Sequence, residues 1–217
     1  MNTLVFSDTH LTTKFDKAKF AYLSKIISRA DKVIINGDFW EGYLISFAEF
    51  LKSDWQNLFP LLKKKETVYI YGNHDEKKLV NEGVDRFSVA QAYSYKVVSP
   101  NYKVHIAHGD KLLTDQGFLS KLPNYKAMIW AGAQVQSVVV KAFGPESWKR
   151  IGGPQNEQMK LWKKTNLAAD EILITGHSHF AEKDLKAGFV NAGFNANNWG
   201  QYLFLREELE FYQERIN

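Results

Sequence analysis

The sequence predicts an α/β fold in which helices pack on a partly parallel sheet. In the first half of the chain, short apolar runs alternate with amphipathic stretches, beginning with Thr3–Phe6 and residues 15–30. Such alternation is typical of βαβ units, whose strands pair in parallel. The second half contains more strand-like runs, and two of them, at residues 93–98 and 102–107, flank the turn Ser99-Pro100-Asn101 and predict a hairpin.

The elements of the first half follow from apolar patterning. Buried strands are predicted where short apolar runs stop at polar residues, namely Thr3–Phe6, 33–35 and 67–71. A helix is predicted over residues 15–30, because apolar residues recur there at helical spacing among lysines. Residues 43–62 are also helical in character, with Pro60 near the end.

The second half adds predicted strands at residues 171–175, 188–192, 201–206 and 209–213. Residues 112–169 differ, because they show helical patterning interrupted by Gly144-Pro145 and Gly152-Gly153-Pro154. The sequence shows no repeat, low-complexity segment or linker. We therefore predict a single domain over residues 1–217, with a helical insertion at about residues 112–169.

Composition narrows the classes of function. The chain has 217 residues, of which 45% are hydrophobic, so a sizeable core is expected. It has no cysteine, which excludes disulfides, thiolate metal sites and a cysteine nucleophile, and leaves histidine, carboxylate and amide groups as metal ligands. The net charge of +4 is mild, and no stripe of Lys and Arg with interleaved aromatic residues predicts a nucleic-acid track.

The N-terminal sequence lacks the features of a signal peptide. Met1 leads directly into Leu4-Val5-Phe6 without a basic region, and no uncharged apolar run reaches the ~20 residues of a membrane span. We therefore expect a cytoplasmic protein, with peripheral contact at the inner membrane face as a further expectation.

Several predicted strands end in residues that commonly bind metals. In chain order the segments are Asp8-Thr9-His10, Gly37-Asp38, Gly72-Asn73-His74-Asp75, His108-Gly109-Asp110 and Gly176-His177-Ser178-His179. Open α/β sheets bind ligands beyond the carboxyl ends of their strands, so these loops are expected to converge. Five of the six histidines lie in them, which is improbable for unrelated core or surface histidines, although the glycines also suit ordinary tight turns. The two-residue spacing within the first and last segments directs both side chains the same way at the end of an extended segment.

The ordered series DTH, GD, GNHD, HGD and GHSH resembles the calcineurin-like metallophosphoesterase superfamily and covers nearly the whole chain. The resemblance implies a four-layer α/β/β/α sandwich of two mixed sheets flanked by helices, with a di-metal centre at one edge. It implies one metal held by Asp8, His10, Asp38 and His179, and a second, bridged by Asp38, held by Asn73, His108 and His177. We expect two divalent ions, with Mn ahead of Fe or Zn.

Such a centre lowers the pKa of a shared water, so hydroxide can attack phosphorus without a protein nucleophile. The resemblance implies that His74 contacts the phosphate and protonates the leaving oxygen. Asp75 is predicted either to orient His74 or to cap a helix at residues 76–79. Glu41 stands near the place where many members have a second acid, and we expect it outside the set of direct metal ligands.

The substrate is inferred from residues 108–115 and from the insertion. Residues 108–115 resemble the corresponding stretch of UDP-diacylglucosamine pyrophosphatases, whose helical insertion covers acyl chains, although those enzymes have Arg in place of His74. The apolar stretches 127–131 and 138–143 suit a lid over a lipid tail, a packed helix or a dimer contact. Lys149 and Arg150 are either contacts of a diphosphate or ordinary surface cations. Together with Asn73 and His74 they form the predicted substrate-binding set.

The sequence thus predicts a di-metal phosphohydrolase that cleaves a phosphodiester or pyrophosphate bond in a small phosphorylated substrate, with a nucleotide-linked lipid as one such substrate. A phosphomonoesterase or protein phosphatase using the same centre is the alternative. A non-catalytic scaffold is a third hypothesis, which the presence of all seven predicted ligands disfavours. The oligomeric state stays open.

Overall fold

The computed structural model describes residues 2–113 and 125–217, with only the backbone described for residues 125–129. Part of the predicted insertion, including Thr114 and Asp115, lies outside the described residues. The first sheet has the strand order β10-β11-β1-β2-β3-β4, and β12 pairs with β11. The second sheet has the order β5-β6-β7-β9-β8. Both sheets are mixed, because β1 to β4 pair in parallel beside antiparallel β11, and β6, β7 and β9 pair in parallel between antiparallel β5 and β8.

The helices and strands of the described residues have the following bounds. The strands are β1 (Thr3–Phe6), β2 (Lys32–Asn36), β3 (Val68–Ile70), β4 (Ala90–Ala92), β5 (Ser94–Val98), β6 (Lys103–Ala107), β7 (Glu171–Thr175), β8 (Glu182–Asp184), β9 (Phe189–Asn191), β10 (Asn195–Ala196), β11 (Trp199–Leu205) and β12 (Leu209–Arg215). The α-helices are α1 (Lys17–Ser28), α2 (Phe47–Lys52), α3 (Phe59–Lys64), α5 (Tyr125–Phe143) and α6 (Lys149–Asn166). Short 3₁₀ helices are η1 (Asp54–Leu58), η2 (Lys77–Leu79), η3 (Glu82–Arg86), η4 (Asp110–Leu112) and η5 (Pro145–Trp148).

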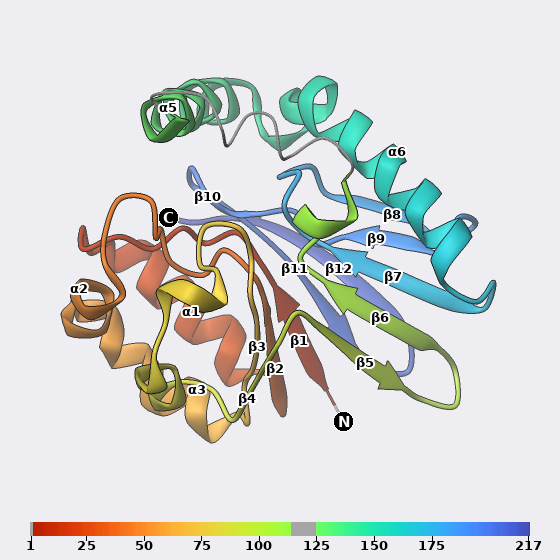
Figure 1. Ribbon diagram of the computed structural model, residues 1–217, viewed down its shortest axis with the longest axis horizontal. Coiled ribbons are helices and arrows are strands. Elements are labelled where there is room, and N and C mark those ends of the chain that lie inside the picture. The colour runs from red at the N-terminus through yellow and green to blue at the C-terminus, as the bar shows by residue number, and fades with distance from the viewer. Residues whose placement is uncertain (1, 114–124) are drawn as a thin grey trace.

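The strands form the middle layers because both of their faces are apolar. In β1, Leu4 and Phe6 point into one hydrophobic cluster and Val5 into another, as the two-residue period of a strand requires. The first cluster joins the sheet to helices α1 to α3, and the second lies between the two sheets. A third, smaller cluster joins Met159 of α6 to the outer face of the second sheet. Figure 1 shows the resulting α/β/β/α layers, with α1 to α3 and α6 on opposite outer faces, and confirms the predicted fold class.

The prediction of one continuous helix over residues 43–62 is wrong. The structure divides this stretch into α2, η1 and α3, and α3 extends to Lys64. Ser46 starts α2 with a reciprocal capping box to Glu49, and Ser53 ends it in an extended conformation. Pro60 lies in the first turn of α3, where its missing N–H costs nothing, rather than near a helix end.

The predicted break at Gly152-Gly153-Pro154 is also wrong, because α6 runs through it. Gly152 lies against the loop between β7 and β8, where an added Cβ would lie 2.6 Å from the carbonyl oxygen of Ser178. The glycine therefore serves close packing of the helix on this loop rather than a turn. Pro154 has no N–H to donate to the carbonyl oxygen of Arg150. Because Arg150 is exposed, water can solvate that carbonyl oxygen instead.

Three short strands, β4, β8 and β10, were not expected from the sequence. Their side chains carry little apolar alternation, β4 and β8 lie at the edges of their sheets, and β10 has only two residues. In the part of the chain that the structure describes, no helix is both long and apolar enough to cross a membrane.

Candidate metal centre

The five predicted metal-binding loops meet at one edge of the two sheets. They follow β1, β2 and β3 of the first sheet and β6 and β7 of the second, all at the carboxyl ends of those strands. Backbone hydrogen bonds join the loops directly, since the N–H of Asp8 donates to Gly37 at 3.1 Å and that of Gly176 donates to His108 at 2.8 Å. The convergence predicted from the sequence is thus present in the structure.

One group of possible metal ligands consists of Asp8, His10 and His179, whose ligand atoms lie within 4.8 Å of one another. The Nε2 of His179 is 3.1 Å from the Oδ1 of Asp8 and 3.1 Å from the Nε2 of His10. All three side chains therefore direct their ligand atoms to the same place. Asp8 is fully buried, whereas the two histidines are partly exposed.

A second group consists of Asp38, His108 and His177. The Nε2 of His108 lies 3.2 Å from the Oδ2 of Asp38, and the Nδ1 of His177 lies 2.9 Å from the Oδ1 of Asn73. The Oδ2 of Asp38 is also 3.9 Å from the Nε2 of His10 in the first group. Asp38 is therefore positioned between the two groups, as the predicted bridging role requires.

The chemistry of these residues fits divalent cations. The Oδ1 of Asp8 is buried, and its polar neighbour is the Nε2 of His179 at 3.1 Å. If that nitrogen directs a lone pair at the carboxylate, the contact is favourable only with a cation bound to both atoms. Burial alone would raise the pKa of Asp38, but His108 and His74 outweigh it and hold that pKa well below its usual range. Burial, reinforced by His108, lowers the pKa of His177 to about 3. An ionised carboxylate and a neutral imidazole are the forms in which these groups bind metals.

The backbone at the centre adopts an unusual conformation. Asp8, His10, Asp38, His177 and His179 all have positive φ, between 46° and 65°. Residues other than glycine adopt this left-handed region infrequently, and such conformations concentrate at functional sites. The common direction of the paired side chains therefore arises from left-handed turns, not from the extended backbone that the sequence spacing suggested.

Two glycines allow the loops to approach the carboxylates. A Cβ added to Gly72 would lie 2.2 Å from the Oδ1 of Asp38, and one added to Gly176 would lie 2.4 Å from the Oδ2 of Asp8. Neither distance is compatible with a side chain. These glycines are thus required for close packing around the centre in addition to any role in a turn.

His74 is held by Glu41, which the sequence placed near the site without a defined contact. The Nδ1 of His74 lies 2.7 Å from a carboxylate oxygen of Glu41, and the Nε2 lies 4.0 Å from the Oδ2 of Asp38. The ring therefore turns its free nitrogen toward the metal centre. Glu41 also contacts the Nδ1 of His10 at 3.0 Å, so one buried carboxylate orients two histidines. Burial alone would raise the pKa of Glu41, but its bonds with these histidines lower it to about 2.

The structure corrects both roles predicted for Asp75. Its carboxylate does not cap the following helix, since η2 begins at Lys77 and has no side-chain cap. The partner of His74 is Glu41. Asp75 instead accepts hydrogen bonds from the backbone N–H groups of Asp38, Phe39 and Gly72, at 3.1, 2.7 and 2.7 Å. It therefore ties the loop after β2 to the loop after β3.

Replacing Asp75 with asparagine should weaken both the fold and the metal centre. The amide can replace only one of two accepting oxygens, so at least one buried N–H loses its acceptor, at about 1–3 kcal/mol. Displacement of the Asp38 loop should lower metal affinity by roughly 10–100-fold. Urea denaturation and metal titration measure the two effects. Asp85→Asn is the matched control, because Asp85 is exposed, and equal behaviour of the two variants would contradict the role assigned to Asp75.

Gln136 of α5 reaches the centre, although no sequence motif marked it. Its Oε1 lies 2.9 Å from the Nδ1 of His179, its side chain is only 5% exposed, and its Nε2 has no hydrogen-bond partner. An acceptor at Nδ1 fixes the tautomer in which Nε2 of His179 carries the lone pair for a metal. Helix α5 is therefore part of the support of the metal centre.

Replacing Gln136 with leucine should reduce metal affinity by roughly 10–100-fold, because His179 loses the acceptor that orients it. The affinity can be measured by titrating metal-free protein with Mn²⁺. Gln134→Leu is the matched control, since Gln134 is exposed on the same helix. Indistinguishable affinities of the two variants would show that the Gln136 contact does not support the centre.

The remaining predicted substrate contacts are not joined to the centre. Lys149 and Arg150 are exposed at the start of α6, and among residues 2–113 and 130–217 neither forms a hydrogen bond or ion pair with the centre. Their role in substrate binding stays a prediction.

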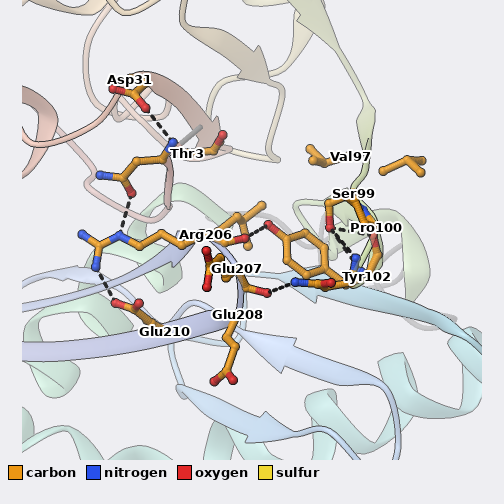
Figure 2. A pocket seen from close by; sticks show the side chains of 14 residues that line it. Thr3, Asp31, Val97, Ser99, Pro100, Tyr102, Arg206, Glu207, Glu208 and Glu210 are labelled. Atoms are coloured by element: carbon orange, nitrogen blue, oxygen red, sulfur yellow. Dashed lines mark hydrogen bonds and ion pairs between the residues drawn. The ribbon is translucent and has the colours of Figure 1, made fainter.

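A cavity of about 830 Å³ lies at the opposite edge of the sheets, near the start of β1 and the end of β5. Its polar side chains bond with one another, as Figure 2 shows for Arg206, which donates to Glu210 at 2.7 Å. Tyr102 donates to the carbonyl oxygen of Arg206 at 2.7 Å. The residues that line this cavity include none of the predicted metal ligands, so the cavity is separate from the metal centre.

Comparisons with known proteins agree with the fold and with the loop motifs. Residues 1–182 match the family model described as calcineurin-like phosphoesterase. A solved archaeal phosphodiesterase is similar at 17% identity and a TM-score of 0.50, covering 99% of this chain and 100% of that one. The phosphoesterase YfcE from E. coli is similar at 16% identity and a TM-score of 0.50, covering 100% of both chains. No curated protein matches the chain. Since the family model spans most of the 217 residues and the carboxylate–histidine groups fall within it, the chain belongs to the calcineurin-like phosphoesterase family and is a metal-dependent phosphoesterase.

Proposed function

We propose that the protein hydrolyses a phosphodiester or pyrophosphate bond in a nucleotide-linked substrate. The observation that carries this proposal is the position of Asp38 between two groups of ligands, within reach of both His108 and His10. Two divalent ions held there by these residues would lower the pKa of a bound water and place positive charge facing the phosphate. We favour Mn²⁺ for both positions, with Fe or Zn as the alternatives.

The residues around the centre support hydrolysis without a covalent intermediate on the protein. Glu41 holds the His74 ring with its Nε2 toward the centre, and His74 is not one of the seven predicted metal ligands. That nitrogen is placed to hydrogen-bond a phosphoryl oxygen and to give a proton to the leaving oxygen. Asn73, whose Oδ1 lies between His108 and His177, is close enough to the same centre to contact the phosphate.

The exposed apolar face of α5 supports a substrate that also carries a lipid. Of the described side chains of this helix, only Gln136 and Val140 are buried. Trp130, Val138 and Phe143 are 54%, 69% and 78% exposed. Large apolar side chains in such a number mark contact with an apolar ligand, a membrane surface or a second protein. We favour the lipid part of a UDP-diacylglucosamine-like substrate, with residues 112–169 as an insertion that covers it.

A panel of substrates with Mn²⁺ tests this proposal. UDP-diacylglucosamine, bis-p-nitrophenyl phosphate and p-nitrophenyl phosphate represent a pyrophosphate, a diester and a monoester. We expect kcat/KM to be highest for the nucleotide-lipid and lowest for the monoester. A preference for the monoester would replace the proposal with the phosphomonoesterase alternative. Absence of turnover with every substrate and metal would favour a scaffold.

A further inference from the structure

A second cavity adjoins the metal centre on the side of the second sheet. Its volume is about 360 Å³, and one of its walls is His108, which also belongs to the Asp38 group of ligands. The cavity lies over the carboxyl end of β6, under α6 and beside η4. Its volume is near the lower limit of the range for small-molecule pockets. A substrate whose phosphate lies at the centre can therefore extend one of its two substituents into this space.

The walls of the cavity are largely aromatic. Tyr71 and Tyr93 have ring centroids 5.5 Å apart, and His105 and Trp162 have ring centroids 6.2 Å apart. Tyr93 is 48% exposed, so much of its surface is open to a ligand. Aromatic walls of this kind bind planar rings by stacking, with little dependence on the identity of the ring.

Polar groups also line this cavity. The Nδ1 of His105 is buried and has no hydrogen-bond partner, and Asp110 is partly buried in the loop that follows β6. The ammonium of Lys111 lies over one face of the Tyr93 ring, 3.6 Å from its centre, so a planar ligand stacks on the other face or displaces this ammonium. An acyl chain would leave the His105 nitrogen buried and unpaired, which is unfavourable, whereas a heterocycle offers donors and acceptors in the plane of its ring.

We propose that this cavity binds the base of a nucleotide substrate while the phosphate lies at the metal centre. The inference rests on the proposed function for the position of the phosphate. The ring stacks on the Tyr93 wall, and the unpaired nitrogen of His105 hydrogen-bonds an edge of the base. The nucleotide and the lipid of one substrate are then bound on different elements, the base beside β6 and the lipid beside α5.

Two esters with the same leaving group isolate the contribution of the base. Thymidine 5′-p-nitrophenyl phosphate and methyl p-nitrophenyl phosphate both release p-nitrophenolate, and they differ in the group that would occupy the cavity. We expect the wild-type protein with Mn²⁺ to show a kcat/KM roughly tenfold or more higher for the thymidine ester. Stacking of one base on an aromatic side chain commonly strengthens binding by a factor of about ten or more.

Substitutions of Tyr93 test whether the preference for the thymidine ester arises in this cavity. Tyr93→Ala should reduce the ratio of the two kcat/KM values by roughly tenfold, mainly through KM, and Tyr93→Phe should retain it. Tyr102→Ala is the matched control, because it deletes an aromatic wall of the cavity at the opposite edge and should leave the ratio at its wild-type value. Loss of stability affects both esters alike and cancels in the ratio.

The outcomes separate this inference from the proposed function. Turnover of both esters with a wild-type ratio near one, or an unchanged ratio in Tyr93→Ala, overturns the base site and leaves the hydrolysis proposal intact. If neither ester is hydrolysed, calorimetry with UMP and with ribose 5-phosphate decides the question. Tighter binding of UMP that is lost in Tyr93→Ala supports the base site although the proposed function has failed, and equal binding of the two ligands overturns it.

Discussion

Replacing Asp38 with asparagine should abolish hydrolysis of bis-p-nitrophenyl phosphate in the presence of Mn²⁺ while leaving the protein folded. Loss of a residue that hydrogen-bonds a metal ligand commonly lowers metal affinity or activity by 10–100-fold. Loss of the carboxylate between the two groups should therefore lower activity by at least about 100-fold. The fold should persist, because asparagine tolerates the φ of 52° at this position. Its amide oxygen can also accept the hydrogen bond from the N–H of His74, now 2.9 Å long.

The controls for Asp38→Asn separate metal loss from unfolding. Asp170→Asn removes an exposed carboxylate that pairs with Lys103, and it should keep wild-type activity. Metal analysis after dialysis should find fewer bound ions in Asp38→Asn than in the wild type, and circular dichroism should find the same secondary structure. Treatment of the wild type with EDTA should reproduce the loss, and added Mn²⁺ should reverse it. Full activity in Asp38→Asn or in EDTA-treated protein would contradict the di-metal mechanism.

The sequence was sufficient for the strands that lead into the centre and insufficient for three short strands, β4, β8 and β10. β1 and β7 were predicted with their observed bounds, because short, continuously apolar runs buried on both faces have a clear pattern. β8 and β10 have no such pattern. Glu182–Asp184 is charged and lies at the edge of the second sheet, so its pairing with β9 depends on tertiary contact rather than on local preference.

A similar limit applies to the metal centre. Residues that end a strand are recognisable from their neighbours, and the convergence of these loops was predicted on that basis. The division of the ligands into two groups was implied by the family resemblance, and the structure brings residues of both groups together. Gln136 is different, because it lies on a helix and contacts His179, 43 residues away, through one hydrogen bond. Asp75 illustrates the opposite error. Proximity in sequence suggested that it acts on His74, whereas its carboxylate reaches across to the loop of Asp38.

Replacing His74 with alanine should reduce kcat by roughly 10²–10⁴-fold with little change in bound metal, because the variant removes a proton donor and not a ligand. Alanine retains the backbone contacts, namely the N–H donated to Asp38 and the carbonyl oxygen that accepts from Gly42 at 3.0 Å. Metal content measured beside kcat checks the assignment. Loss of both metals in His74→Ala would show that the ring is a ligand after all.

The size of the loss for different leaving groups distinguishes proton donation from phosphate binding. p-Nitrophenolate is a weak base and leaves without being protonated, whereas an alkoxide is a strong base and needs a proton to leave. If His74 protonates the leaving oxygen, His74→Ala should therefore reduce hydrolysis of an alkyl phosphodiester by a larger factor than that of bis-p-nitrophenyl phosphate. Glu41→Gln serves as the companion variant, because its amide can hold only one of the two rings that the carboxylate now contacts. Equal losses for both substrates would assign His74 to binding the phosphate, since a contact with the phosphoryl oxygens does not depend on the group that departs.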